Sequence, residues 1–144
     1  MTSDLGGRNR ASRDRLAAVI ARLGGRSVDL PGGWTTAALL AHLAFWDGFG
    51  GARLEKFARD REAMELGSDT LTEFINAAGM AQWRATLPAV AGDLASEAAA
   101  AIDRLIEGLP AEVLEEIRAM KRPRLLDRSL HRKEHLDEIE RAIR

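Results

Sequence analysis

The chain has 144 residues, 46% hydrophobic and 30% charged, which is the composition of an ordinary globular protein with room for one domain. Its 21 Lys and Arg residues nearly balance 22 Asp and Glu residues, so no overall positive field favours nucleic acid as a partner. The absence of cysteine excludes disulfides, thiolate metal ligands and a cysteine nucleophile. No apolar run is long enough to span a membrane, and the polar N-terminus does not resemble a secretory signal. We therefore expect a cytoplasmic protein.

Hydrophobic periodicity predicts helices along most of the chain, and no strand-like alternation is evident. The first expected helix carries an apolar stripe over residues 16–23 and ends at Gly24. The second begins after Thr35, which is a suitable N-cap. It continues through a glycine-rich stretch, residues 48–51, where we expect either a kink or the close approach of another element.

The second half of the chain is also predicted to be helical. A capping-box pattern at residues 70–73 indicates the start of a third helix, and Pro88 suits the first turn of a fourth. The expected apolar stripe of the fourth helix comprises Val90, Leu94, Ala98, Ala101, Leu105 and Leu109. A short helix over about 111–118 and a last helix from about Leu125 complete the chain. We predict a single all-α domain, residues 1–144, built as a four-helix bundle with one or two short extra helices in its connections. Residues 1–9 are expected to be disordered.

The three histidines are the strongest candidates for a functional site. His131 and His135 are four residues apart on the last expected helix, so both imidazoles project from one face and can meet one metal ion. His42 lies on the apolar face of the second helix, which is expected to point into the bundle. The alternative, three ordinary hydrogen-bonded core histidines, has equal weight on these patterns alone. Three imidazoles with an open fourth position are typical of a catalytic metal, and Zn²⁺ or Ni²⁺ is expected because imidazole suits the later transition metals.

Two segments of the chain resemble the DinB superfamily. Residues 33–47, GWTTAALLAHLAFWD, are similar to its G-W-S/T, H-L and W pattern, and residues 131–140, HRKEHLDEIE, to the H-x-x-x-H-L-x-x-I of its last helix. The resemblance spans about residues 16–143. It implies a DinB-like four-helix bundle in which His42, His131 and His135 form a histidine triad for a divalent metal.

The resemblance also implies an activity. The superfamily includes mycothiol-dependent maleylpyruvate isomerases and bacillithiol transferases. The resemblance therefore implies a metal-dependent S-transferase that joins an external low-molecular-weight thiol, such as mycothiol, to a small electrophile. Maleylpyruvate isomerisation itself is not expected, because the second domain that those isomerases carry after the bundle is not seen. A metal-dependent hydrolase and a non-catalytic small-molecule binding or protection protein are the alternatives, and no catalytic residue is assigned.

Other polar and aromatic residues are candidates for the surroundings of the site. We expect Trp46, Asn76 and Trp83 to line a substrate cleft near one end of the bundle, with core packing as the alternative for Trp46. The basic stretch 121–124 is expected to be a solvated loop, and the alternative is that it borders this cleft and attracts an anionic ligand. Asp47 and Glu134 are expected on the solvated surface, and the alternative is that their carboxylates orient a ligand histidine. The expected partners are small molecules, with neither nucleic acid nor membrane, for a monomer or a homodimer.

Overall fold

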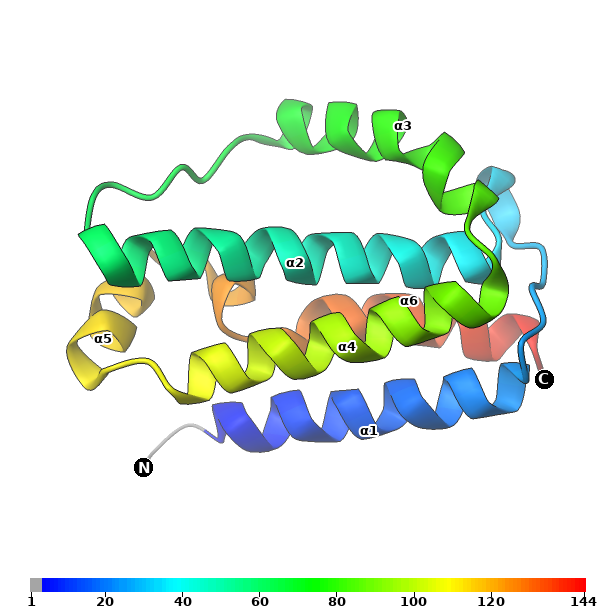
Figure 1. Cartoon of the computed structure of the whole chain (residues 1–144), viewed down its shortest axis with the longest axis horizontal. Coiled ribbons are helices and arrows are strands. Elements are labelled where there is room, and N and C mark those ends of the chain that lie inside the picture. The colour runs from blue at the N-terminus through cyan, green and yellow to red at the C-terminus, as the bar shows by residue number, and fades with distance from the viewer. Residues whose placement is uncertain (1–3) are drawn as a thin grey trace.

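The computed structural model describes residues 4–144, which form six α-helices and two short 3₁₀ helices (Figure 1). In chain order they are α1 (Leu5–Leu23), η1 (Pro31–Gly33), α2 (Thr36–Asp60), α3 (Asp69–Ala85), α4 (Pro88–Glu107), α5 (Ala111–Ala119), η2 (Pro123–Leu125) and α6 (Ser129–Ala142). The all-α prediction is confirmed for this part of the chain, where the only β pairing is an isolated bridge between Asp29 and Thr35. None of the helices described is both long and apolar enough to cross a membrane.

Helices α1, α2, α4 and α6 pack around a common core. The contacting pairs are α1 with α6, α6 with α2, α2 with α4 and α4 with α1, so the four helices close into a ring. Figure 1 shows them running side by side, with α3 along the outer side of α2 and α5 at the end of the molecule away from the C-terminus. This arrangement leaves α2 in contact with both α3 and α6, and the candidate site is built between these three helices.

The N-terminal helix begins earlier than expected. α1 starts at Leu5, where the Asp4 side chain accepts a hydrogen bond from the backbone N of Gly7, so the prediction of disorder over residues 1–9 is wrong for residues 5–9. Residues 1–3 lie outside the described range. Asn9 gives the physical reason. Its side chain is buried, and its Oδ1 accepts from the backbone N–H groups of Arg128 and Ser129 at 2.9 and 3.2 Å. The sequence does not show this partner, because it lies more than a hundred residues away.

Two helix starts and one buried face differ from the predictions. α3 begins at Asp69 with Ser68 as its N-cap, and α6 begins at Ser129 because η2 occupies residues 123–125. The buried face of α4 is not the predicted stripe. It comprises Ala91, Gly92, Ala95, Ala99, Ile102, Asp103 and Ile106. Val90 and Leu94 are each 44% exposed. Small side chains allow α4 to lie close to α2, and periodicity alone cannot choose between two adjacent apolar stripes.

Helix α2 carries His42 and is anchored as predicted. The Thr35 side chain accepts from the backbone N of Ala38, and α2 then runs without interruption through the glycine-rich stretch. At Gly50 a Cβ atom would lie 3.2 Å from Cδ1 of Ile102 on α4. Of the two predicted explanations for the glycines, close approach therefore holds at Gly50, and the helix does not break.

Candidate metal centre

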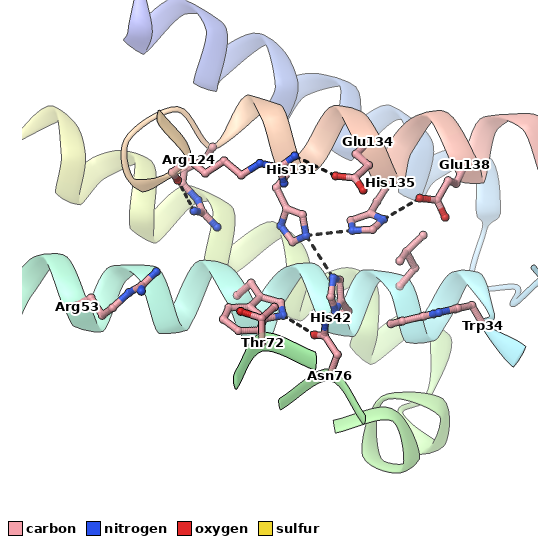
Figure 2. A pocket seen from close by; sticks show the side chains of 13 residues that line it. Trp34, His42, Arg53, Thr72, Asn76, Arg124, His131, Glu134, His135 and Glu138 are labelled. Atoms are coloured by element: carbon pink, nitrogen blue, oxygen red, sulfur yellow. Dashed lines mark hydrogen bonds and ion pairs between the residues drawn. The ribbon is translucent and has the colours of Figure 1, made fainter. Parts of the chain in front are cut away.

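The three histidines predicted as metal ligands converge on one point. Nε2 of His131 lies 3.2 Å from Nε2 of His42 and 3.0 Å from Nε2 of His135. One ligand nitrogen from each residue lies within 4.8 Å of the others. Figure 2 shows the two imidazoles of α6 pointing across to His42 on α2. The packing of α6 against α2 therefore joins residues that are 89 positions apart in the sequence.

The His42 ring is enclosed by aromatic side chains. It is 4% exposed, and its centroid lies 5.2 Å from Trp34 and 5.0 Å from Trp83, with both indoles nearly perpendicular to it. Its Nδ1 is buried and has no hydrogen-bond partner in the described structure. Burial, and secondly the proximity of His135, lowers the pKa of His42 to about 3, so this ring is neutral at neutral pH.

The pair on α6 differs in its surroundings. Burial, followed by the nearby His135, lowers the pKa of His131 to about 2. Nδ1 of His135 lies 3.1 Å from Oε1 of Glu138, one helical turn further on. A carboxylate at that nitrogen orients the ring and directs Nε2 toward a metal. Glu138 was not among the predicted site residues, although its three-residue spacing from His135 on a helix is a usable signal.

The donor set fits a divalent metal ion. For a tetrahedral ion with Zn–N bonds of about 2.1 Å, neighbouring ligand nitrogens are separated by roughly 3.4 Å. The two measured Nε2 separations, 3.2 and 3.0 Å, are close to that value. Burial keeps His42 and His131 neutral, as coordination requires, and Glu138 supplies an outer partner for His135. The three imidazoles of this chain can therefore hold one metal ion and leave a position for another ligand.

A groove of about 480 Å³ leads to the histidines. Its lining comes from the segment before α2, from α2, α3 and α6, and from the η2 region: Trp34, Leu39, His42, Trp46, Arg53, Thr72, Asn76, Arg124, Arg128, His131, Glu134, His135 and Glu138. The lining on α2 runs from Leu39 to Arg53, about four helical turns, so the groove follows the flank of the molecule. The predicted position of the cleft near one end of the bundle is therefore wrong. Because helices pack through their sides, the space between α2, α3 and α6 was not predictable from helix order.

Two of the three predicted cleft residues line this groove. Trp46 and Asn76 both do, and the indole Nε1 of Trp46 donates to Oδ1 of Asn76 at 2.9 Å, which ties α3 to α2. Trp83 does not line it. Its side chain is buried, 6% exposed, and packs against His42 and Trp34 in the core. The Trp83 indole fills the core behind the site and supports the His42 ring. It does not border the groove.

A buried charge network lies directly beside the triad, and the sequence analysis missed it. Arg132 is 1% exposed and forms ion pairs with Asp103 on α4 and Asp47 on α2, while Arg128 pairs with Asp47 at 2.9 Å. The prediction that Asp47 is solvated is wrong, because these two arginines compensate its burial. Asp47 follows Leu43 by four residues, which places it on the core face and could have indicated its burial. Glu134 lies near the surface as predicted and pairs with Arg124.

Comparisons with protein-family models, with curated proteins and with solved structures gave no match to this chain. The site defined by the structure is a histidine triad able to bind a metal, set in the wall of an open groove. Its function is therefore inferred from the chemistry of these residues.

Proposed function

We propose that this chain is a four-helix bundle of the DinB type whose triad binds Zn²⁺ or Ni²⁺, and that it acts as a low-molecular-weight-thiol S-transferase. The observation that carries the proposal is the convergence of His42, His131 and His135 at the wall of a groove large enough for a small molecule. The closed ring of α1, α2, α4 and α6, and the match of all three histidines to the motif positions of the superfamily, support the bundle type.

The chemistry follows from a neutral histidine set and an imported thiol. The imidazoles of His42, His131 and His135 would hold a divalent ion, whose charge would lower the pKa of a thiol and favour its nucleophilic thiolate form. The chain has no cysteine, so the sulfur comes from the co-substrate. In the transfer, the thiol proton passes to solvent, the sulfur forms a bond to an electrophilic carbon, and the leaving group departs with the bonding electrons.

The residues of the groove bind and orient the two substrates. Glu138 fixes the ring of His135, and the Trp46–Asn76 hydrogen bond holds α3 over the groove opposite the triad. The indole of Trp46 offers an apolar wall for the electrophile. Mycothiol is our proposed thiol, and the electrophile is a small organic molecule.

The test uses tag-free protein loaded with Co²⁺, which reports its ligands by absorption. Addition of glutathione or mycothiol is expected to produce a thiolate-to-cobalt charge-transfer band, and the Zn²⁺-loaded protein is expected to accelerate the reaction of the thiol with monochlorobimane, which loses chloride. His131→Gln is the matched control and should show neither effect. A protein that binds cobalt but responds to no thiol would contradict the transferase. Thiol-independent ester cleavage would then indicate a hydrolase, and its absence a binding protein.

A further inference from the structure

The groove continues past the triad into a region crowded with arginine. A second cavity shares Arg53, Thr72, Arg124 and Arg128 with the first and adds Arg122. We call Arg53, Arg122, Arg124 and Arg128 the arginine end of the groove. Figure 2 shows Arg53 and Arg124 on one side of the triad and Trp34 on the other. The groove therefore has a cationic end and a central histidine cluster, with Trp34 and Glu138 beyond it.

Only part of this positive charge is compensated within the protein. Arg128 pairs with Asp47, and Arg124 pairs with Glu134. Among residues 4–144 no carboxylate lies within ion-pair distance of Arg53 or Arg122. Two guanidinium groups at this end therefore remain without a negative partner.

Arg53 is held in place but not saturated. Its Nη1 donates to the backbone carbonyls of Glu65 and Leu66 at 3.3 and 3.5 Å, and its guanidinium lies 4.9 Å from the Phe49 ring. Its Nε is buried and has no hydrogen-bond partner in the described structure. The hydrogen bonds from Nη1 support the connection between α2 and α3, residues 61–68, and this accounts for Nη1. It does not account for Nε, because burying a donor without an acceptor is unfavourable.

The arginines are also close enough to repel one another. Burial is the main cause that lowers the pKa of Arg53, followed by the charges of Arg128 and Arg122. An anion between these groups would offset both the repulsion and the unsatisfied donor. Guanidinium groups bind planar carboxylates and phosphates through paired charge-assisted hydrogen bonds.

We propose that the arginine end binds a carboxylate or phosphate group of an elongated ligand whose other end reaches the histidine triad. This inference rests on the proposed function, because it describes the substrate of the same groove. Arg53 follows His42 by eleven residues on α2, which separates their Cα atoms by roughly 16 Å along the helix. A ligand that contacts both ends is therefore extended, with its reactive group distant from its anionic group.

The experiment measures anion binding to metal-free protein, so that it is independent of metal and thiol. Inorganic phosphate and, in a separate arm, acetate are titrated at low ionic strength while the ¹⁵N NMR signals of the arginine Nε–H groups are followed. We expect phosphate or acetate to shift the Arg53 signal. Arg53→Gln and Arg122→Gln should each raise the dissociation constant about tenfold, the effect of losing one charge-assisted contact. The arm with the tighter binding identifies the anionic group.

The matched control is Arg59→Gln, which removes a positive charge from an exposed position of the same helix outside the groove. It should change the dissociation constant by less than about twofold, as a screened surface charge does. Equal weakening by Arg59→Gln, or no shift of the Arg53 signal at saturating phosphate and acetate, would overturn the proposal. If Arg53→Gln fails to fold, Arg122→Gln decides, because its side chain is exposed. If the anions bind as expected but no thiol changes the absorption of the Co²⁺-loaded protein, the transferase proposal is contradicted and the anion site is retained.

Discussion

Arg132 on α6 and Asp103 on α4 form a buried two-pronged ion pair. Nη1 of Arg132 lies 3.0 Å from Oδ2 of Asp103, and Nη2 lies 2.9 Å from Oδ1. The two side chains are 1% and 0% exposed. Arg132 directly follows the candidate ligand His131 in the sequence, so this pair fixes the first turn of α6 against the bundle and thereby the position of the triad.

Asp103→Ala should therefore destabilise the protein strongly. Removing one partner leaves a buried guanidinium charge poorly compensated, which costs about 3–5 kcal/mol. The double variant Asp103→Leu with Arg132→Met should lose much less, because both charges of the buried pair are removed together and Asp47 keeps its ion pair with Arg128. Urea unfolding followed by circular dichroism measures both, with Glu107→Ala as control, since its pair with Arg10 on the surface is worth less than about 1 kcal/mol. Equal losses for Asp103→Ala and Glu107→Ala would contradict this role of the pair.

His131→Gln should abolish tight metal binding without unfolding the protein. Nε2 of His131 lies between the Nε2 atoms of His42 and His135, and the two imidazoles that remain without it are a poor site for Zn²⁺. The core packing of α1, α2, α4 and α6 does not depend on this side chain. Competition with a chromophoric chelator measures zinc affinity, and circular dichroism measures helicity. Loss of helicity in metal-free wild-type protein would instead show that the metal is coupled to folding.

The stability of the metal-free protein should fall as the pH falls below about 6.5. The pKa values of His42 and His131, about 3 and 2, lie below the ordinary value of 6.5. Between these limits the unfolded chain binds protons that the folded chain does not, so each histidine contributes a slope of up to about 1.4 kcal/mol per pH unit.

Urea unfolding between pH 7 and pH 4.5 measures this slope. The double variant His42→Gln with His131→Gln should show a shallower dependence of stability on pH. Its remaining acid sensitivity comes from carboxylates such as Asp137. Hydrogen bonds from Lys133 and Arg15 lower the pKa of Asp137 to about 2. An unchanged slope in the double variant would contradict the burial of the two neutral rings.

Two glycines of α2 should respond differently to alanine. Gly48 is exposed and a Cβ atom there would meet nothing within 4 Å, so Gly48→Ala should stabilise the protein by about 0.5–1 kcal/mol through helix propensity. At Gly50 the same atom would press on Ile102 and approach Arg128 at 3.7 Å. We expect Gly50→Ala to gain less than Gly48→Ala or to destabilise. Thermal unfolding compares them, and an equal gain at both positions would show that the close approach at Gly50 carries no cost.

The sequence by itself determined the helical class and the identity of the three histidines. These follow from local rules: apolar residues recur with the helical period, Thr35 caps α2, and two histidines four residues apart share one helix face. The sequence also indicated Trp46 and Asn76, because Trp46 lies one turn beyond His42 on the same helix face and Asn76 is an amide in an otherwise apolar stretch.

Only the tertiary structure decided what surrounds these residues. Asn9, Asp47 and Arg132 have side chains of polar types that usually lie on the surface, yet each is buried by partners on other elements. The buried stripe of α4 and the position of the groove likewise depend on which helices touch. The physical reason is that a helix specifies its own period and caps within a few residues, whereas the partner that compensates a buried charge or fills a gap is chosen by packing across long sequence separations.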